Sequence, residues 1–280
     1  MQVVQSQPPD DPPAAPSPLP PNRRRAGIYL LPNLFTTSAL FAGFYGVVAA
    51  INGRFEAAAI AILVAMVFDG MDGRIARMTN TQSDFGAQYD SLADMVSFGV
   101  APALVMYEWA LRGLGKLGFV VAFMYTAGAA LRLARFNTQV GVADKRYFQG
   151  LPSPSAAALV AALVWFGDSI AARESGFMMA AAMLVTILSA LLMVSNLRYY
   201  SFKEFDLHGR VPFVAVLAVV LVFVLISVQP ESVLLIGFGG YAASGVIETM
   251  KQRRKRRAER RASKRAAAAA QDPPSSPTES

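Results

Sequence analysis

The sequence predicts an all-α integral membrane protein with about eight transmembrane helices. Of its 280 residues, 54% are hydrophobic and 16% are charged, whereas about a quarter of the residues in a soluble protein carry a charge. The apolar residues are grouped into stretches of roughly 20, which is the length of a helix that crosses the hydrocarbon core. The basic residues are concentrated in alternate loops, as positive-inside topology requires.

Eight stretches have the composition expected of membrane spans. The fifth and the eighth are the weakest, because Asp168, Glu231 and Glu248 shorten their apolar lengths. In chain order, the expected spans are residues 28–51, 57–77, 86–109, 117–136, 155–171, 177–196, 211–228 and 231–249.

Polar tails flank the predicted membrane domain of residues 28–249. Residues 1–27 are rich in proline and end in a basic flank, so we expect them to be disordered. We do not expect a signal peptide here, since the first apolar run is too long and has no clear cleavage site. Residues 250–280 are first basic and then of low complexity, with disorder expected from Ala266 onward.

The basic residues predict that both termini lie in the cytoplasm. One side of the membrane carries 22 of the 26 Lys and Arg residues, and the other side carries Arg54, Arg112, Lys116 and Arg173. Positive residues mark the cytoplasmic side, so we expect a multi-pass protein of the inner (cell) membrane. Ten of the basic residues lie in the segment Lys251–Arg265. Next to a membrane helix this segment favours topology signalling or anionic headgroups, and we expect no nucleic-acid partner.

The composition also restricts the chemistry. There is no cysteine, and the one histidine, His208, lies in a polar loop. A metal site must therefore use carboxylate oxygens, which favour hard cations such as Mg²⁺, Mn²⁺ or Ca²⁺.

The second and third spans carry four aspartates, at positions where hydrocarbon disfavours charge. Each helix places its polar and small residues on one stripe, and the short linker between the helices makes them antiparallel, so the two stripes can face each other. The stripes are Asp69, Asp72, Gly73 and Ala76 in the second span, and Gly86, Asp90 and Asp94 in the third.

This concentration of carboxylates predicts a metal site near the cytoplasmic end. A carboxylate at the membrane centre costs about 2.5–3.5 kcal/mol on insertion scales, and four of them also repel one another. One or two divalent cations would offset that cost. Salt bridges to Arg74 and Arg77 are the alternative, but they account for one or two of the aspartates and not for four on facing stripes.

These residues resemble the signature of the CDP-alcohol phosphatidyltransferases, with all eight fixed positions and the spacer of eight residues present. The matching residues are Asp69, Asp72, Gly73, Ala76, Arg77, Gly86, Asp90 and Asp94. The resemblance implies a helical bundle of that family. It also implies that Asp69, Asp72 and Asp90 bind divalent metal, as two Mg²⁺ or Mn²⁺ ions, and that Asp94 is a further ligand or the catalytic base.

The resemblance assigns the remaining signature residues to a CDP-lipid site. Gly73, Ala76, Arg77 and Gly86 would contact the nucleotide. Asn33, outside the signature, is a further candidate for binding the CDP-lipid, with helix capping as its alternative role. The implied reaction is the transfer of a phosphatidyl group from CDP-diacylglycerol, within membrane lipid, to an alcohol. The family also suggests a homodimer.

Other segments resemble the phosphatidylserine synthases of the membrane-embedded class, which implies L-serine as the acceptor. The serine carboxylate needs a cation near the metals, and Arg suits bidentate carboxylate binding, so Arg132, Arg135 and Arg198 are the candidates. Ordinary membrane anchoring is the alternative role for each of them. The similar segments are Leu31–Thr36, Asp94–Pro102, Leu133–Asn137, Phe148–Pro154 and Val194–Tyr199.

Two other functions stay open. Another acceptor, such as glycerol 3-phosphate, an inositol phosphate or choline, would use the same metal site, and Lys145 and Arg146 could help to bind a phosphorylated one. A cation transporter could also place aspartates in the membrane. Transporters, however, typically show internal repeats and helices broken near the midplane, and the sequence has neither.

Overall fold

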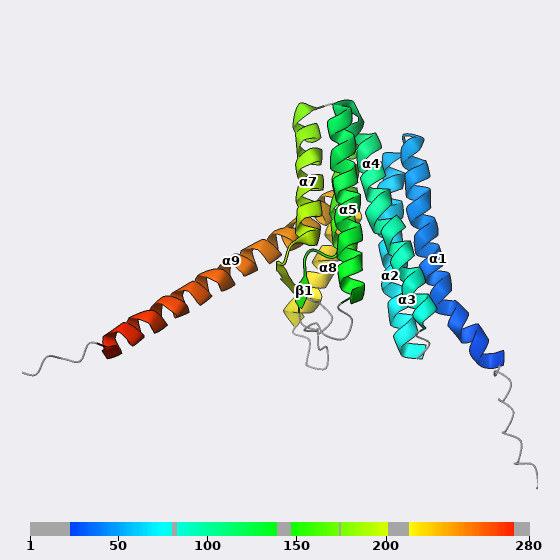
Figure 1. Ribbon diagram of the computed structural model, residues 1–280. Helices are drawn as coiled ribbons and strands as arrows, with labels where there is room; N and C mark the ends of the chain where they lie inside the picture. The colour runs from blue at the N-terminus through cyan, green and yellow to red at the C-terminus, as the bar shows by residue number, and fades with distance from the viewer. Residues whose placement is uncertain (1–22, 80–82, 139–146, 174, 201–212, 272–280) are drawn as a thin grey trace, which may run out of the picture.

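Helices follow all eight predicted spans in the computed structural model, which describes residues 23–79, 83–138, 147–173, 175–200 and 213–271. The predicted all-α fold is confirmed, apart from one pair of three-residue strands (Figure 1). In chain order, the elements are α1 (Arg23–Ile51), α2 (Phe55–Thr79), α3 (Asp84–Asp94), the π-helical η1 (Met95–Val100), α4 (Ala101–Trp109), the 3-10 turn η2 (Leu111–Leu114), α5 (Lys116–Thr138), β1 (Tyr147–Gln149), α6 (Ser153–Ser169), α7 (Gly176–Val194), β2 (Arg198–Tyr200), α8 (Phe213–Val228) and α9 (Pro230–Gln271).

Within the described ranges, four helices are long and apolar enough to cross a membrane by themselves. They are Leu31–Ile51 in α1, Lys116–Thr138, Gly176–Val194, and Pro230–Gln252 in α9. The third predicted span is divided among α3, η1 and α4, and the other three fall short for identifiable reasons. Helices α6 and α8 have 17 and 16 residues, and α2 carries the charged signature residues. The structure is therefore that of a helical membrane protein, with four of the eight predicted crossings recognisable by length and hydropathy.

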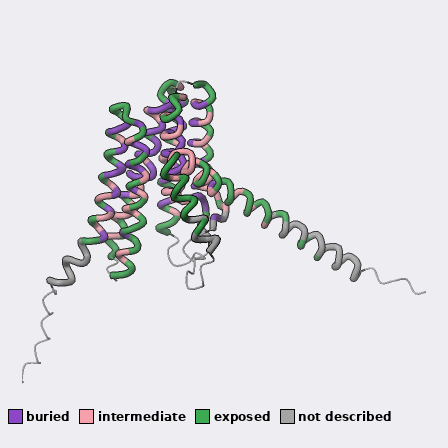
Figure 2. The backbone as a smooth tube through the Cα atoms, turned by 180° about the vertical axis from the view of Figure 1, so that it is seen from behind, coloured by how far each residue is buried: buried purple, intermediate pink, exposed green. Residues whose placement is uncertain are grey.

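The helices pack closely because their inner faces are lined mainly by alanine. Small side chains let helix backbones approach one another in a membrane bundle. Buried residues follow the inner faces of the bundle, and the outer faces are exposed (Figure 2). α1 packs along α2, and α3 packs on α1. The alanines among the fully buried core residues include Ala49, Ala58, Ala65, Ala129 and Ala161.

The third predicted span is one uninterrupted helix, which includes a π-helical segment directly after Asp94. A π-helical segment shifts the hydrogen-bond register, and such segments are frequent at functional sites. Here α5 supports the segment from the side. The Tyr125 hydroxyl donates to the Phe98 carbonyl at 3.2 Å, and the Thr126 hydroxyl donates to the Gly99 carbonyl at 3.4 Å. These bonds fix the backbone immediately beyond Asp94.

The predicted tails differ in part from the structure. α1 begins at Arg23, inside the predicted N-terminal tail, and α9 continues to Gln271 as it leaves the bundle (Figure 1). The expected disorder from Ala266 is therefore wrong for residues 266–271, where a run of alanines, the best helix formers, extends α9. Residues 1–22 and 272–280 lie outside the described ranges, as do Lys145, Arg146 and His208.

Candidate active site

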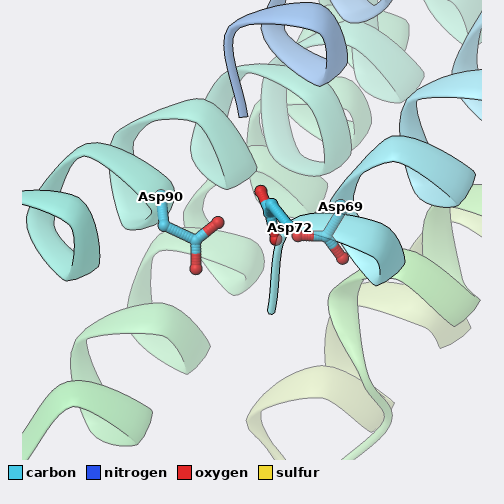
Figure 3. A group of neighbouring side chains, drawn as sticks. All are labelled: Asp69, Asp72 and Asp90. Atoms are coloured by element: carbon cyan, nitrogen blue, oxygen red, sulfur yellow. The ribbon is translucent and has the colours of Figure 1, made fainter. Parts of the chain in front are cut away.

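Three carboxylates converge where α2 faces α3. Asp69 and Asp72 come from α2 and Asp90 comes from α3, and one oxygen of each lies within 4.8 Å of the others (Figure 3). Asp72 is buried, while Asp69 and Asp90 are half-buried. The spacing of three residues on α2 places its two aspartates on one face of the helix. This face is turned toward α3, as the two stripes in the sequence predict.

Two polar contacts define this carboxylate cluster further. The hydroxyl of Thr36, on α1, donates to Oδ2 of Asp72 at 2.7 Å. Thr36 was not identified as a site residue from the sequence, although it is the last residue of the similar segment Leu31–Thr36. Oδ1 of Asp90 is buried and has no hydrogen-bond partner in the part of the chain that the structure describes. A buried carboxylate oxygen left without a partner is costly, and a cation would satisfy it.

Asp94 lies beside the cluster, one helical turn beyond Asp90. Its carboxyl group is within hydrogen-bonding reach of Asp69, and it is attracted by Arg132 from α5. It is not one of the three residues whose oxygens converge. This position lets Asp94 act next to a bound ion without having to hold it.

A cavity of about 200 Å³ opens directly on the cluster. Small residues from both halves of the signature line it, and Gly86 shows why their size matters. A Cβ atom at Gly86 would lie 3.1 Å from Ser83 Oγ and 3.5 Å from Asn33 Oδ1, so a larger residue would crowd the wall. Arg77 is exposed and is not among the lining residues. The lining consists of Pro32, Asn33, Thr36, Asp72, Gly73, Ala76, Ser83, Gly86, Ala87 and Asp90.

A larger apolar groove of about 770 Å³ lies between α1 and α2. It begins at Thr37 and Phe68, the residues next to Thr36 and Asp69, so it adjoins the polar site. Phe41, Ile60 and Val64 continue its lining with aliphatic and aromatic side chains. An apolar chain attached to a group in the site could lie in this groove while staying in the hydrocarbon layer.

The structure separates the three arginines that the sequence proposes for the acceptor. Arg132 lies near enough to Asp94 for the two charges to interact. Arg135 donates instead to Oδ1 of Asn196 at 3.1 Å, which ties α5 to the end of α7. The backbone of Arg198 pairs with Gln149 in the strand pair, and its side chain lies outside the described part of the chain. Of the two arginines whose side chains are described, Arg132 is thus the one whose charge interacts with a signature aspartate.

The donor set fits a hard divalent cation. Mg²⁺ and Mn²⁺ are bound through carboxylate oxygens, and three of these oxygens meet here between two helices. The helices are linked by a short segment and capped at the start of α3, where the Ser83 hydroxyl accepts the Gly86 N–H at 3.0 Å. The carboxylates are therefore held by rigid elements.

Comparison with known proteins identifies relatives of the chain. The family model described as CDP-alcohol phosphatidyltransferase matches residues 29–192. The chain is 36% identical over 220 residues to the CDP-diacylglycerol–serine O-phosphatidyltransferase of Helicobacter pylori, which covers 79% of this chain and 91% of that protein. It is 38% identical over 159 residues to the protein of the same name from Mycobacterium tuberculosis, covering 53% of this chain and 55% of that one. The protein of that name from Saccharomyces cerevisiae is 37% identical over 139 residues, which is 45% of this chain and 50% of the yeast protein.

Proposed function

The chain belongs to the CDP-alcohol phosphatidyltransferase family, and on that premise we propose that it transfers a phosphatidyl group from CDP-diacylglycerol to L-serine. The products are phosphatidylserine and CMP. The main support for this class of reaction is that three aspartate oxygens converge beside a cavity lined by small signature residues. The choice of serine is supported by the relatives named for that acceptor, one of which is covered over 91% of its length.

We propose that Asp69, Asp72 and Asp90 hold Mg²⁺ or Mn²⁺, as two ions, with Asp94 as a further ligand or the base and Ca²⁺ as the alternative metal. Such ions, when bound, neutralise the pyrophosphate oxygens and the charge that develops on the leaving CMP. Thr36 orients Asp72 through its hydrogen bond. Partners of this kind fix the direction of a ligand's lone pairs.

The protein residues would position the two substrates for an in-line displacement. The small residues Gly73, Ala76 and Gly86 leave room for the CDP group, with Asn33 beside them and Arg77 at the exposed edge. Asp94 would accept the proton of the serine hydroxyl as its oxygen bonds to the phosphatidyl phosphorus. The bond from that phosphorus to the bridging oxygen breaks, and CMP leaves. The apolar groove between α1 and α2 would hold part of the diacylglycerol chain.

The membrane topology extends this proposal. Eight crossings with both termini in the cytoplasm, in the inner (cell) membrane, would place the aspartates at the cytoplasmic side, where the water-soluble acceptor is available. The bias of basic residues supports this orientation. Homodimerisation stays a prediction from the family.

An acceptor panel tests the proposed function. Purified protein in mixed micelles with CDP-diacylglycerol is given L-serine, glycerol 3-phosphate, an inositol phosphate or choline, and the lipid products are identified by mass spectrometry. We expect phosphatidylserine as the product.

The same assay tests the metal site. Activity should disappear with a chelator and return with Mg²⁺ or Mn²⁺, because the ligands are all carboxylate oxygens. Transfer to glycerol 3-phosphate with serine inert would refute the acceptor, and full activity after exhaustive chelation would refute the metal site.

Replacing Arg132 by lysine tests the acceptor site. We expect Arg132→Lys to raise the KM for serine by about 10-fold or more, because a point charge replaces a planar fork and charge-assisted bonds to carboxylates are worth about 1.5–3 kcal/mol. The KM for CDP-diacylglycerol should change much less. Arg135→Lys provides the comparison, since its guanidinium is bound to Asn196. A larger rise in the serine KM for Arg135→Lys than for Arg132→Lys would indicate that Arg135, and not Arg132, binds the serine carboxylate.

A further inference from the structure

Ser153 is a buried polar residue that the reaction described above does not use. It is the first residue of α6 and has no exposed surface. Its hydroxyl oxygen accepts a hydrogen bond from Nη1 of Arg132 at 2.9 Å. Ser153 belongs to the segment Phe148–Pro154, which the sequence singles out without assigning it a role.

The loop before α6 fixes the place of Ser153. The N–H of Gly150 donates to the Leu197 carbonyl at 2.8 Å, which anchors the loop beyond the end of α7. Gly150 has φ of +78°, and a Cβ atom there would clash with the Met193 carbonyl oxygen. Both the conformation and the close approach therefore require glycine. The strand pair of β1 and β2 continues this contact, because Gln149 pairs with Arg198. Ser153 thus starts α6 from a backbone that has little freedom.

The bond to Ser153 uses one nitrogen of the Arg132 guanidinium and leaves Nε without a partner in the described part of the chain. The bound nitrogen is Nη1, and Nε is buried. A buried donor without a partner is costly. A carboxylate would satisfy it, since the planar guanidinium matches two carboxylate oxygens. Asp94 is the nearby anion that interacts with Arg132, but the hydrogen bond of Arg132 goes to Ser153.

We propose that Ser153 is a positioning residue for the acceptor. Its hydrogen bond holds the Arg132 guanidinium in place, so that Nε stays free to bind the carboxylate of an amino-acid substrate. This inference rests on the proposed function, since it requires an acceptor that has a carboxylate. Without the Ser153 hydroxyl, Asp94 attracts the guanidinium unopposed. Arg132 then turns toward the proposed base and away from the position in which it receives the acceptor.

Ser153→Ala tests this proposal through the two Michaelis constants, which do not depend on the fraction of folded enzyme. We expect the KM for L-serine to rise about 10-fold or more, as the loss of a hydrogen bond to a charged group predicts. The KM for CDP-diacylglycerol should stay within about twofold of its value in the unmodified enzyme, because that substrate is bound on α2 and α3. Ser153→Cys retains the volume and only a weak acceptor, so it should change the serine KM in the same direction if the alanine variant yields too little protein.

Ser189→Ala is the matched control. Ser189 is as buried as Ser153, but its hydroxyl oxygen has no hydrogen-bond partner within the described ranges, so both KM values should stay unchanged. An unchanged serine KM in both Ser153 variants, or an equal rise in both KM values, would overturn the positioning role. Unmodified enzyme that fails to use serine would instead refute the proposed function.

Discussion

Asp90→Asn is expected to reduce turnover by more than about 100-fold, with the protein still folded and inserted in the membrane. Partners that merely orient a metal ligand change affinity or activity by about 10–100-fold, and Asp90 offers its oxygen to the converging cluster itself. Asparagine has nearly the same size, and it removes negative charge from a group of carboxylates that repel one another. The folded protein without metal therefore loses no hydrogen bond of Asp90, and Asp69→Asn should lower turnover to a similar extent.

Two measurements separate this effect from unfolding. The thermal midpoint in the presence of chelator should be unchanged or higher in Asp90→Asn, and the rise in midpoint that Mg²⁺ or Mn²⁺ produces in the unmodified protein should be lost. Asp168→Asn is the control. Asp168 is also half-buried on a helix, but it lies at the end of α6 opposite to Ser153, and it is Ser153 whose end of α6 contacts Arg132. It should retain activity. An active Asp90→Asn enzyme with its metal-dependent stabilisation intact would exclude Asp90 as a ligand.

The carboxylate cluster could be predicted from sequence because its information is local. Asp69 and Asp72 lie three residues apart on one helix, and a short linker turns the chain back into the helix that carries Asp90. Helix periodicity and the expense of charge in a membrane then suffice to place the three side chains together. The same reasoning locates the helices, since each apolar run of sufficient length becomes one.

The contacts around the cluster could not be predicted, because they join residues far apart in the chain. Thr36 reaches Asp72 from α1, and Ser153 reaches Arg132 from α6. Neither hydroxyl differs in sequence from the serines and threonines that bond their own helix, such as Thr186 to Ala182. Distinguishing Arg132 from Arg135 required the helix packing as well, because both have the same residue type and lie one turn apart. The helical end of α9 differs from the prediction because low complexity indicates disorder, whereas the alanines from residue 266 onward also favour continuation of a helix.

The second large effect is expected at Asp94, where chemistry and binding should separate. If Asp94 accepts the hydroxyl proton, Asp94→Asn should lower turnover by about 100- to 10,000-fold, the range typical of a lost general base. The affinity for CDP-diacylglycerol, measured in the presence of Mg²⁺ or Mn²⁺ with the acceptor omitted, should stay within about threefold. The physical reason is the geometry: the three converging oxygens belong to Asp69, Asp72 and Asp90, and Asp94 stands beside them.

The comparison with Asp90→Asn decides between the two roles proposed for Asp94. In Asp94→Asn the new side chain can still hydrogen-bond to Asp69, so the shape of the site is retained. The variant has one negative charge fewer, so it repels the anionic pyrophosphate of CDP-diacylglycerol less than the unmodified enzyme does. Asp90→Asn, by contrast, should lose turnover and CDP-lipid affinity together. If Asp94→Asn also loses affinity in parallel with turnover, then Asp94 is mainly a metal ligand, and another group must receive the proton of the serine hydroxyl.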